Sequence, residues 1–152
     1  MSELTHWING EHVKGTSGRF ADVFNPATGE VQAKAPLANA DEMAIAVAGA
    51  SAAQPAWAAT NPQRRARVMM RFVALLNRDM DKLAEALSRE HGKTLPDAAG
   101  DVQRGLEVVE YCIGAPELLK GDYTNNAGPG SDMDSMRHAL GVSAGITPGH
   151  SP

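Results

Sequence analysis

Apolar and polar residues alternate over the first 36 positions, which predicts short β-strands. Residues 5–8 run into Asn9-Gly10, a dipeptide typical of a two-residue hairpin turn, and a second short strand follows. A further pair of strands is predicted at 21–24 and 31–35, joined by the turn sequence NPATGE. The last strand alternates apolar and polar residues, so we expect one of its faces to contact water.

After residue 39 the hydrophobic period lengthens to between three and four, which predicts an α-helix. Asn39 and Glu42 have the spacing of a capping box, in which each side chain bonds the backbone N–H of the other residue. This first helix is rich in alanine and is expected to end near Pro55 and Trp57.

A second helix is predicted to begin at Asn61-Pro62, with the asparagine as N-cap and the proline in the first turn. Its apolar stripe is interrupted near residues 77–79, where we expect a break. Gly92 follows the last apolar turn and is expected to be the C-terminal cap.

The third predicted helix covers about residues 96–119 and is apolar on two faces, which is typical of a helix packed between layers. A polar, glycine-rich loop is expected at 121–131, followed by two strands at 133–140 and 142–147. The final strand has no partner in the sequence that follows it. The predicted architecture is therefore α/β and incomplete as a domain.

Composition narrows the class of protein but assigns no chemistry. At 152 residues the chain has the length of one domain, which would bury roughly 70% of its unfolded surface. A formal charge of −4 gives no electrostatic reason to expect a nucleic acid or an anionic membrane as partner. No apolar run approaches the length of a membrane span, and no secretory signal is visible. With a single cysteine, these features predict a cytoplasmic protein that acts on small metabolites.

Few residues qualify as candidates for catalysis or metal binding. Cys112 is the only thiol and lies within an apolar helical stretch, so we expect it to be a buried packing residue. The five histidines lack the spacing of a metal site, and no metal is expected. A basic run at residues 64–71 is followed by acidic residues on the same segment, which favours a solvated face.

Arg104 has two interpretations. By helical spacing it shares a face with Val108 and Tyr111, where a guanidinium could bind a carboxylate through two parallel hydrogen bonds. Alternatively it pairs locally with Asp101 or Glu107, three residues to either side. Spacing alone favours local pairing.

Several segments, in order, resemble the N-terminal third of an aldehyde dehydrogenase. The matching segments are WINGEHV, VFNPATGEV, the alanine-rich helix ending in PAW, RRARVMMRFVALL, REHGKTLPDAAGDVQRGLEVVEYCIGAPELLKG and RHALGVSAGITP. Within the fifth of these, the stretches GKTLPDAAGDVQRGLEVVEY and LLKG more specifically resemble the CoA-acylating methylmalonate-semialdehyde dehydrogenases. The resemblance spans essentially residues 7–148.

This resemblance implies an NAD-dependent oxidation of methylmalonate or malonate semialdehyde, a small-molecule substrate. A cysteine attacks the aldehyde, a hydride passes to NAD, and the acyl group is transferred to coenzyme A with loss of CO₂, giving propionyl-CoA or acetyl-CoA. The family's nucleophile lies beyond residue 152, and Cys112 does not match its motif, so the chain alone is expected to be inactive. The alternative is a non-catalytic module of a truncated chain that binds a partner subunit.

The family fold also implies a division of the chain. Residues 1–121 would form the N-terminal part of the NAD-binding domain as β-hairpins and three helices. Residues 122–141 would be a hairpin of the arm through which subunits form a homo-oligomer. Residues 142–152 would be the first central strand of a doubly wound sheet, followed by the loop that reaches the cofactor.

Three residues match functional positions of the family, and a fourth position departs from it. Arg104, in GDVQRG, matches the arginine that holds the substrate's carboxylate, and Thr147 and Gly149 match positions that contact the cofactor. His150 stands where the family has an asparagine whose amide donates a hydrogen bond to the developing oxyanion. The resemblance carries no catalytic residue and no metal ligand onto this chain.

Overall fold

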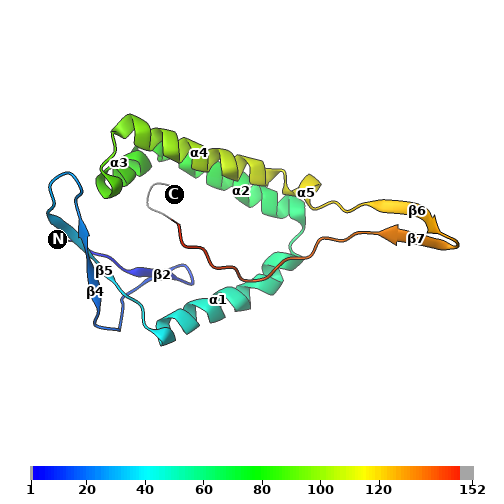
Figure 1. Ribbon diagram of the computed structural model, residues 1–152, viewed down its shortest axis with the longest axis horizontal. Helices are drawn as coiled ribbons and strands as arrows, with labels where there is room; N and C mark the ends of the chain where they lie inside the picture. Colours follow the sequence, from blue (N-terminus) through cyan, green and yellow to red (C-terminus); the bar gives the residue numbers. More distant parts are fainter. Residues whose placement is uncertain (1, 148–152) are drawn as a thin grey trace.

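The structure, a computed structural model, describes residues 2–147, with side chains from residue 4 onward (Figure 1). Its N-terminal part is made of short strands, as predicted. Strand β1 (Ser2–Glu3) pairs in parallel with β5 (Val31–Pro36), which pairs antiparallel with β4 (Phe20–Phe24). Strands β2 (His6–Ile8) and β3 (Glu11–Val13) form a separate antiparallel hairpin.

The turns between these strands follow from their sequences. Asn9 and Gly10 have φ of 55° and 83°, the left-handed conformation that a two-residue hairpin turn with this twist requires. In the NPATGE turn, the Asn25 side chain accepts from the backbone N–H of Ala27 at 2.9 Å. The N–H of Gly29 donates to the Asn25 carbonyl at 2.8 Å. Both predicted turns are confirmed.

Helix α1 (Ala40–Ala59) begins at the predicted capping box. The N–H of Glu42 donates to Asn39 Oδ1, and the N–H of Asn39 donates to Glu42 Oε2, each at 2.9 Å. The helix continues through Pro55 and ends at Ala59, two residues after Trp57, so only the expectation that Pro55 stops it is wrong. Proline fixes a φ close to the helical value and removes one backbone donor, so a helix can retain it when neighbouring turns hold.

Helices α2 (Pro62–Arg78) and α3 (Met80–His91) follow the predicted boundaries. The Asn61 side chain accepts from the N–H of Gln63 at 2.9 Å, and Asp79 separates the two helices within the predicted break. Gly92 ends α3 in the left-handed conformation, with φ of 84°. These ends depend on residues only a few positions apart, which is why the sequence locates them.

The single helix predicted at 96–119 is instead two helices, α4 (Leu95–Ile113) and the short α5 (Ala115–Leu118), interrupted at Gly114. Helix α4 packs on one side only. Val102 and Leu106 are buried, whereas Val108 and Tyr111 are 63% and 68% exposed. The sequence correctly identified two apolar faces, but the described residues supply only one of the two expected layers.

The segment predicted as a loop at 121–131 forms most of an antiparallel hairpin, so that prediction is wrong. Strands β6 (Tyr123–Gly128) and β7 (Ser131–Asp134) project from the body of the molecule (Figure 1). Asp132 stabilises the hairpin, since its carboxylate accepts from the Tyr123 hydroxyl at 2.7 Å and from the Asn126 N–H at 2.8 Å. Polar cross-strand hydrogen bonds carry this pairing, and hydrophobic alternation does not reveal them.

Residues 135–147 form no strand, which corrects the predicted strands at 133–140 and 142–147. Only Met133 and Asp134 of the first segment are paired, as the end of β7. The backbone of a strand needs a neighbouring strand for its hydrogen bonds. The Ser135 N–H still donates to the Asp122 carbonyl at 2.9 Å, but no backbone hydrogen bond joins the described residues 136–147 to another described segment. Leu140 and Ile146 are fully exposed as a result.

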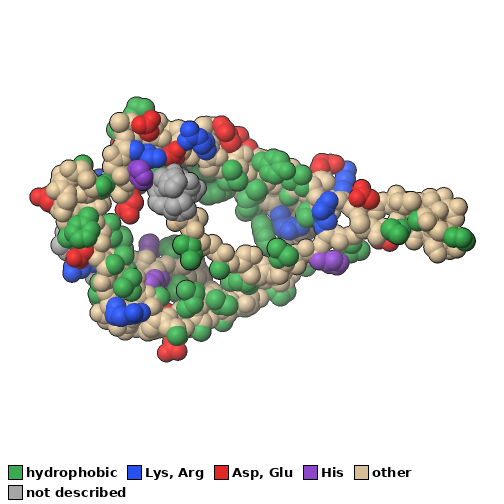
Figure 2. Space-filling view, viewed as in Figure 1, with side chains coloured by type: hydrophobic (Ala, Val, Ile, Leu, Met, Phe, Trp, Pro, Cys, Tyr) green, Lys and Arg blue, Asp and Glu red, His purple; other side chains and the backbone are tan. Residues whose placement is uncertain are grey.

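The buried core lies where α4 packs against α2 and α3, and it is small. The buried apolar residues of the helices are Ala66, Ala84, Ala98, Val102 and Leu106. The accessible surface is 11243 Å², against about 7,400 Å² expected for a compact protein of 16.0 kDa. The expectation that folding buries 70% of the surface of the unfolded chain is therefore wrong, since only about half of that surface is buried. Hydrophobic side chains gather on the visible surface over α1 and α2 (Figure 2).

Candidate functional site

The junction between α3 and α4 positions the charged residues of the candidate site. The Gly92 N–H donates to the Ser88 carbonyl at 2.7 Å and ends α3. The Ser88 hydroxyl donates to the Lys93 carbonyl, also at 2.7 Å. Thr94 then caps α4, because its hydroxyl oxygen accepts from the Asp97 N–H at 3.4 Å. Lys93 is thereby fixed in the short link between two helix ends.

Asp101 lies between two cations. Its Oδ2 accepts from Lys93 Nζ and its Oδ1 accepts from Arg104 Nη1. The Asp101 and Lys93 side chains are 13% and 16% exposed, whereas Arg104 is 76% exposed. Local pairing of Arg104 is therefore real, and its partner is Asp101. Glu107, the other candidate partner, instead accepts from Gln103 Nε2 at 3.2 Å.

The surroundings of Arg104 also fit the second interpretation. Val108 and Tyr111 lie one and two helical turns further along α4, and both are exposed. A guanidinium has five N–H donors, and the pair with Asp101 is made through Nη1 alone. Arg104 thus forms a local ion pair and still has N–H donors that can bind a ligand beside apolar side chains. An arginine of this kind can bind a carboxylate on a small organic molecule.

Sequence reasoning did not single out Lys93. It lies outside the helix and eight residues before Asp101, so no helical spacing connects the two. The only available indication was its place directly before the N-cap of α4, from which a long side chain can reach back along the first turns.

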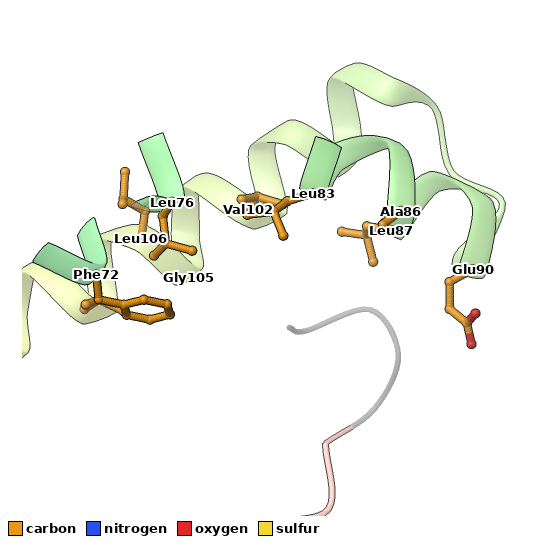
Figure 3. A pocket seen from close by; sticks show the side chains of 10 residues that line it. Phe72, Leu76, Leu83, Ala86, Leu87, Glu90, Val102, Gly105 and Leu106 are labelled. Atoms are coloured by element: carbon orange, nitrogen blue, oxygen red, sulfur yellow. The ribbon is translucent and has the colours of Figure 1, made fainter. Parts of the chain in front are cut away.

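An apolar groove of about 570 Å³ runs along the layer of α2, α3 and α4 (Figure 3). It forms where the apolar stripes of these helices meet, and Glu90 is the charged residue at one end. Arg104 is not among its lining residues, which are Phe72, Leu76, Leu83, Ala86, Leu87, Glu90, Val102, Gly105, Leu106 and Val109. Its lining fits contact with apolar protein surface better than recognition of a charged substrate.

Cys112 is exposed, which corrects the prediction of a buried packing residue. On α4 it lies to one flank of the side that carries Val102 and Leu106, close to Ala66 and Met69 of α2. Trp57 and Arg65 line a small pocket of about 170 Å³ together with Cys112. Among residues 2–147, no group of three or more His, Cys, Asp or Glu side chains could hold a metal ion.

The residues expected to contact the cofactor are not assembled into a site. Thr147 is exposed on the unpaired segment 135–147, and Gly149 and His150 lie outside the described residues. A dinucleotide site needs a strand end and a helix N-terminus that together bind the pyrophosphate. The described residues around Thr147 offer neither, so they do not fit NAD by themselves.

None of the helices in the described part of the chain is long and apolar enough to cross a membrane.

Comparison with known proteins gives consistent matches along the whole chain. Residues 12–152 match the model of the aldehyde dehydrogenase family. A malonate-semialdehyde dehydrogenase of Pseudomonas aeruginosa is 50% identical over 152 residues, which are 100% of this chain and 30% of that protein. A mitochondrial, acylating methylmalonate-semialdehyde dehydrogenase of Arabidopsis thaliana is 46% identical over 145 residues, or 95% of this chain and 24% of that protein.

A solved structure also matches the fold of this chain. It is the NAD complex of a Sinorhizobium meliloti 1021 protein provisionally assigned as a methylmalonate-semialdehyde dehydrogenase. That structure superposes with a TM-score of 0.94 at 61% sequence identity, over 98% of this chain and 30% of the other. The chain therefore spans 24–30% of the length of these relatives and matches their N-terminal third.

Proposed function

The chain belongs to the aldehyde dehydrogenase family and has the N-terminal part of its α/β fold, and on that premise we propose an activity for the full-length protein. By full-length protein we mean one of the relatives' length that carries this chain. The proposed reaction is the NAD-dependent, CoA-acylating oxidation of malonate or methylmalonate semialdehyde to acetyl-CoA or propionyl-CoA, with release of CO₂. The names of the relatives support it: one is a malonate-semialdehyde enzyme, another is acylating, and a third is solved with NAD.

In this proposal the chain contributes recognition of the substrate. A semialdehyde of this class carries a carboxylate at the end opposite the aldehyde, and Arg104 binds it. The observation that carries this assignment is the ion pair with Asp101, which uses Nη1 and leaves the other donors of an exposed guanidinium free. Two parallel hydrogen bonds from one guanidinium to one carboxylate fix its distance and its orientation.

The chemical steps belong to the remainder of the full-length protein. We propose that the nucleophilic cysteine lies there and that this chain alone is inactive. The exposed Cys112 sits in the last turn of α4, with no histidine among the lining residues of its pocket to act as a base. NAD supplies the hydride acceptor when bound, and the residues proposed to contact it from this chain are Thr147 and Gly149. His150 takes the place of the family's oxyanion donor.

We propose the same division of the chain as the resemblance implies. Residues 1–121 belong to the NAD-binding domain, and 142–152 become a central strand once a partner strand lies beside them. Residues 122–141 form an arm for a homo-oligomer, which is supported by the hairpin β6–β7, whose side chains are almost all exposed. We keep the cytoplasm as the proposed location, while the Arabidopsis relative is named as mitochondrial.

The test is Arg104→Leu in the full-length protein, assayed with malonate semialdehyde and with propanal, a neutral aldehyde of the same carbon number. Loss of a hydrogen-bonded ion pair to the substrate should lower kcat/KM for the semialdehyde by about ten- to a hundredfold. The value for propanal should change little. Arg67→Leu is the matched control, because Arg67 is an exposed arginine on α2. An unchanged preference for the semialdehyde in Arg104→Leu would remove the assigned role.

A further inference from the structure

We propose that Asp101 and Lys93 are positioning residues for Arg104, and that the three together present one net positive charge to the substrate. The inference rests on the proposed function, because it takes Arg104 to bind a carboxylate. It adds Lys93, to which neither the comparisons nor the sequence assigned a role, and it gives Asp101, expected only as a local partner of Arg104, a role in substrate binding.

The Asp101 carboxylate is held firmly because it is shielded and both of its oxygens are used. It is 13% exposed, with Lys93 on Oδ2 and Arg104 on Oδ1. A carboxylate removed from water to this extent needs cationic partners to remain charged. Asp101 is therefore a fixed acceptor on α4, and its hydrogen bond orients the guanidinium of Arg104.

Lys93 decides how much charge remains for a ligand. An isolated Asp101–Arg104 pair would be neutral, and a substrate carboxylate would then compete with Asp101 for its only cation. With Lys93 on Oδ2, two cations face one carboxylate, so the group has a charge of +1. Lys93 is only 16% exposed and its backbone carbonyl is bound by Ser88. It therefore stays beside Asp101 when Arg104 contacts a substrate.

The contact with Asp101 also limits how Arg104 can move. The side chain is 76% exposed and would otherwise sample many rotamers in water. One bond through Nη1 directs the guanidinium while its remaining donors stay available. Pre-organisation of this kind strengthens binding, because less rotamer freedom is lost when the substrate arrives.

The test uses the full-length protein and the ratio of kcat/KM for malonate semialdehyde to kcat/KM for propanal. Asp101→Asn keeps the size of the side chain but removes its charge. The group then has a charge of +2, but Arg104 loses the charged acceptor that directs it, and we expect this loss of orientation to dominate and to lower the ratio about three- to tenfold, mainly through KM. Lys93→Met should lower it to a similar extent because the group becomes neutral, and Lys93→Arg should restore it. Lys93→Met keeps the proposal testable should Asp101→Asn fail to fold.

The matched control is Asp97→Asn, which makes the same change one turn earlier on α4. Asp97 bonds Thr94 at the helix cap, so its loss should leave the ratio unchanged. The double variant Asp101→Asn/Arg104→Leu should lose no more of the ratio than Arg104→Leu alone, since the orienting role of Asp101 needs Arg104.

The outcomes separate this inference from the proposed function. If Arg104→Leu leaves the ratio unchanged, the proposed function fails and this inference fails with it. If Arg104→Leu lowers the ratio but Asp101→Asn and Lys93→Met do not, only the inference is overturned. A higher ratio in Asp101→Asn would make Asp101 a competitor of the substrate. An equal loss of kcat/KM for both aldehydes in Asp101→Asn would show that Asp101 has a purely structural role. Either result overturns the inference.

Discussion

At the scale of single residues, Glu42 is the buried carboxylate that joins α1 to the segment before β4. It is 6% exposed and accepts from the N–H of Asn39 at 2.9 Å and from the N–H of Thr16 at 2.6 Å. His6 Nε2 lies 3.9 Å away from Oε1. The hydrogen bond from Asn39, followed by that from Thr16, lowers the pKa of Glu42 below its ordinary value. Glu42 thus caps α1 and also links this helix to Thr16, a residue distant in the sequence.

This lowered pKa makes part of the stability dependent on pH. A carboxyl group whose pKa is lower in the folded state stabilises the fold above its unfolded pKa, and the contribution disappears as pH falls through the folded pKa. Glu42→Gln in the full-length protein should therefore lower Tm at pH 7, and the difference from wild type should shrink as the pH falls below about 4.5, the ordinary pKa of a glutamate. Thermal melts from pH 7 to pH 3 measure it.

The control for that prediction is Glu110→Gln, because Glu110 is an exposed carboxylate on α4. Its melts should follow those of the wild type at each pH. A Tm difference for Glu42→Gln that stays constant from pH 7 to pH 3 would show that its charge contributes nothing to folding.

At the scale of elements, the end of α3 contacts the turn between β4 and β5. Gly92 has φ of 84°, and a Cβ added there would lie 2.7 Å from Pro26 Cγ. Nearby, the Gln32 side chain donates to the Arg89 carbonyl at 3.2 Å and to the Phe24 carbonyl at 3.3 Å. Glycine at position 92 therefore serves two purposes, since it ends the helix and lets the sheet approach it.

Two glycine variants can separate these purposes. Gly130 also has positive φ, 70°, but a Cβ there meets nothing within 4 Å. Gly130→Ala should cost only the strain of a left-handed alanine, about 1–2 kcal/mol. Gly92→Ala should cost about 1–3 kcal/mol more, because Pro26 or the helix end must also shift. Urea unfolding midpoints of the full-length variants measure both, and equal losses would contradict the contact between Gly92 and Pro26.

At the scale of the whole molecule, the chain exposes more apolar surface than a compact monomer of its mass. Exposed residues lie on α1, as Met43 and Ile45, and on the outer face of α4, as Val108 and Tyr111. The apolar groove along α2–α4 adds to this surface (Figure 3). Contiguous apolar surface of this kind is normally covered by further protein. The relatives are about three times as long as this chain, so they contain further residues that can cover such a surface.

The 152-residue chain expressed alone should therefore form oligomers or aggregates and bind a hydrophobic dye. Light scattering and dye fluorescence measure this, with the full-length protein as reference. Replacing the hairpin β6–β7 by a short flexible link should not abolish association, because the exposed helix faces remain. A monodisperse monomer that melts cooperatively would contradict the prediction.

The sequence by itself determined the features that depend on near neighbours. The capping box of Asn39 and Glu42, the Asn9-Gly10 turn, the break at Asp79 and the cap at Gly92 each involve residues at most a few positions apart. Backbone hydrogen bonds and preferred φ values decide such features locally, so short patterns predict them. The resemblance to the family likewise rested on the order of segments along the chain.

Which long-range partners are present became clear only from the folded chain. It selected Asp101 over Glu107 for Arg104 and brought Lys93 to the same carboxylate. It also exposed Cys112, paired the polar residues of the hairpin β6–β7, and left 135–147 without a neighbouring strand. Burial and strand pairing depend on surfaces that come together from distant parts of a chain, and the pattern along a single segment does not specify them.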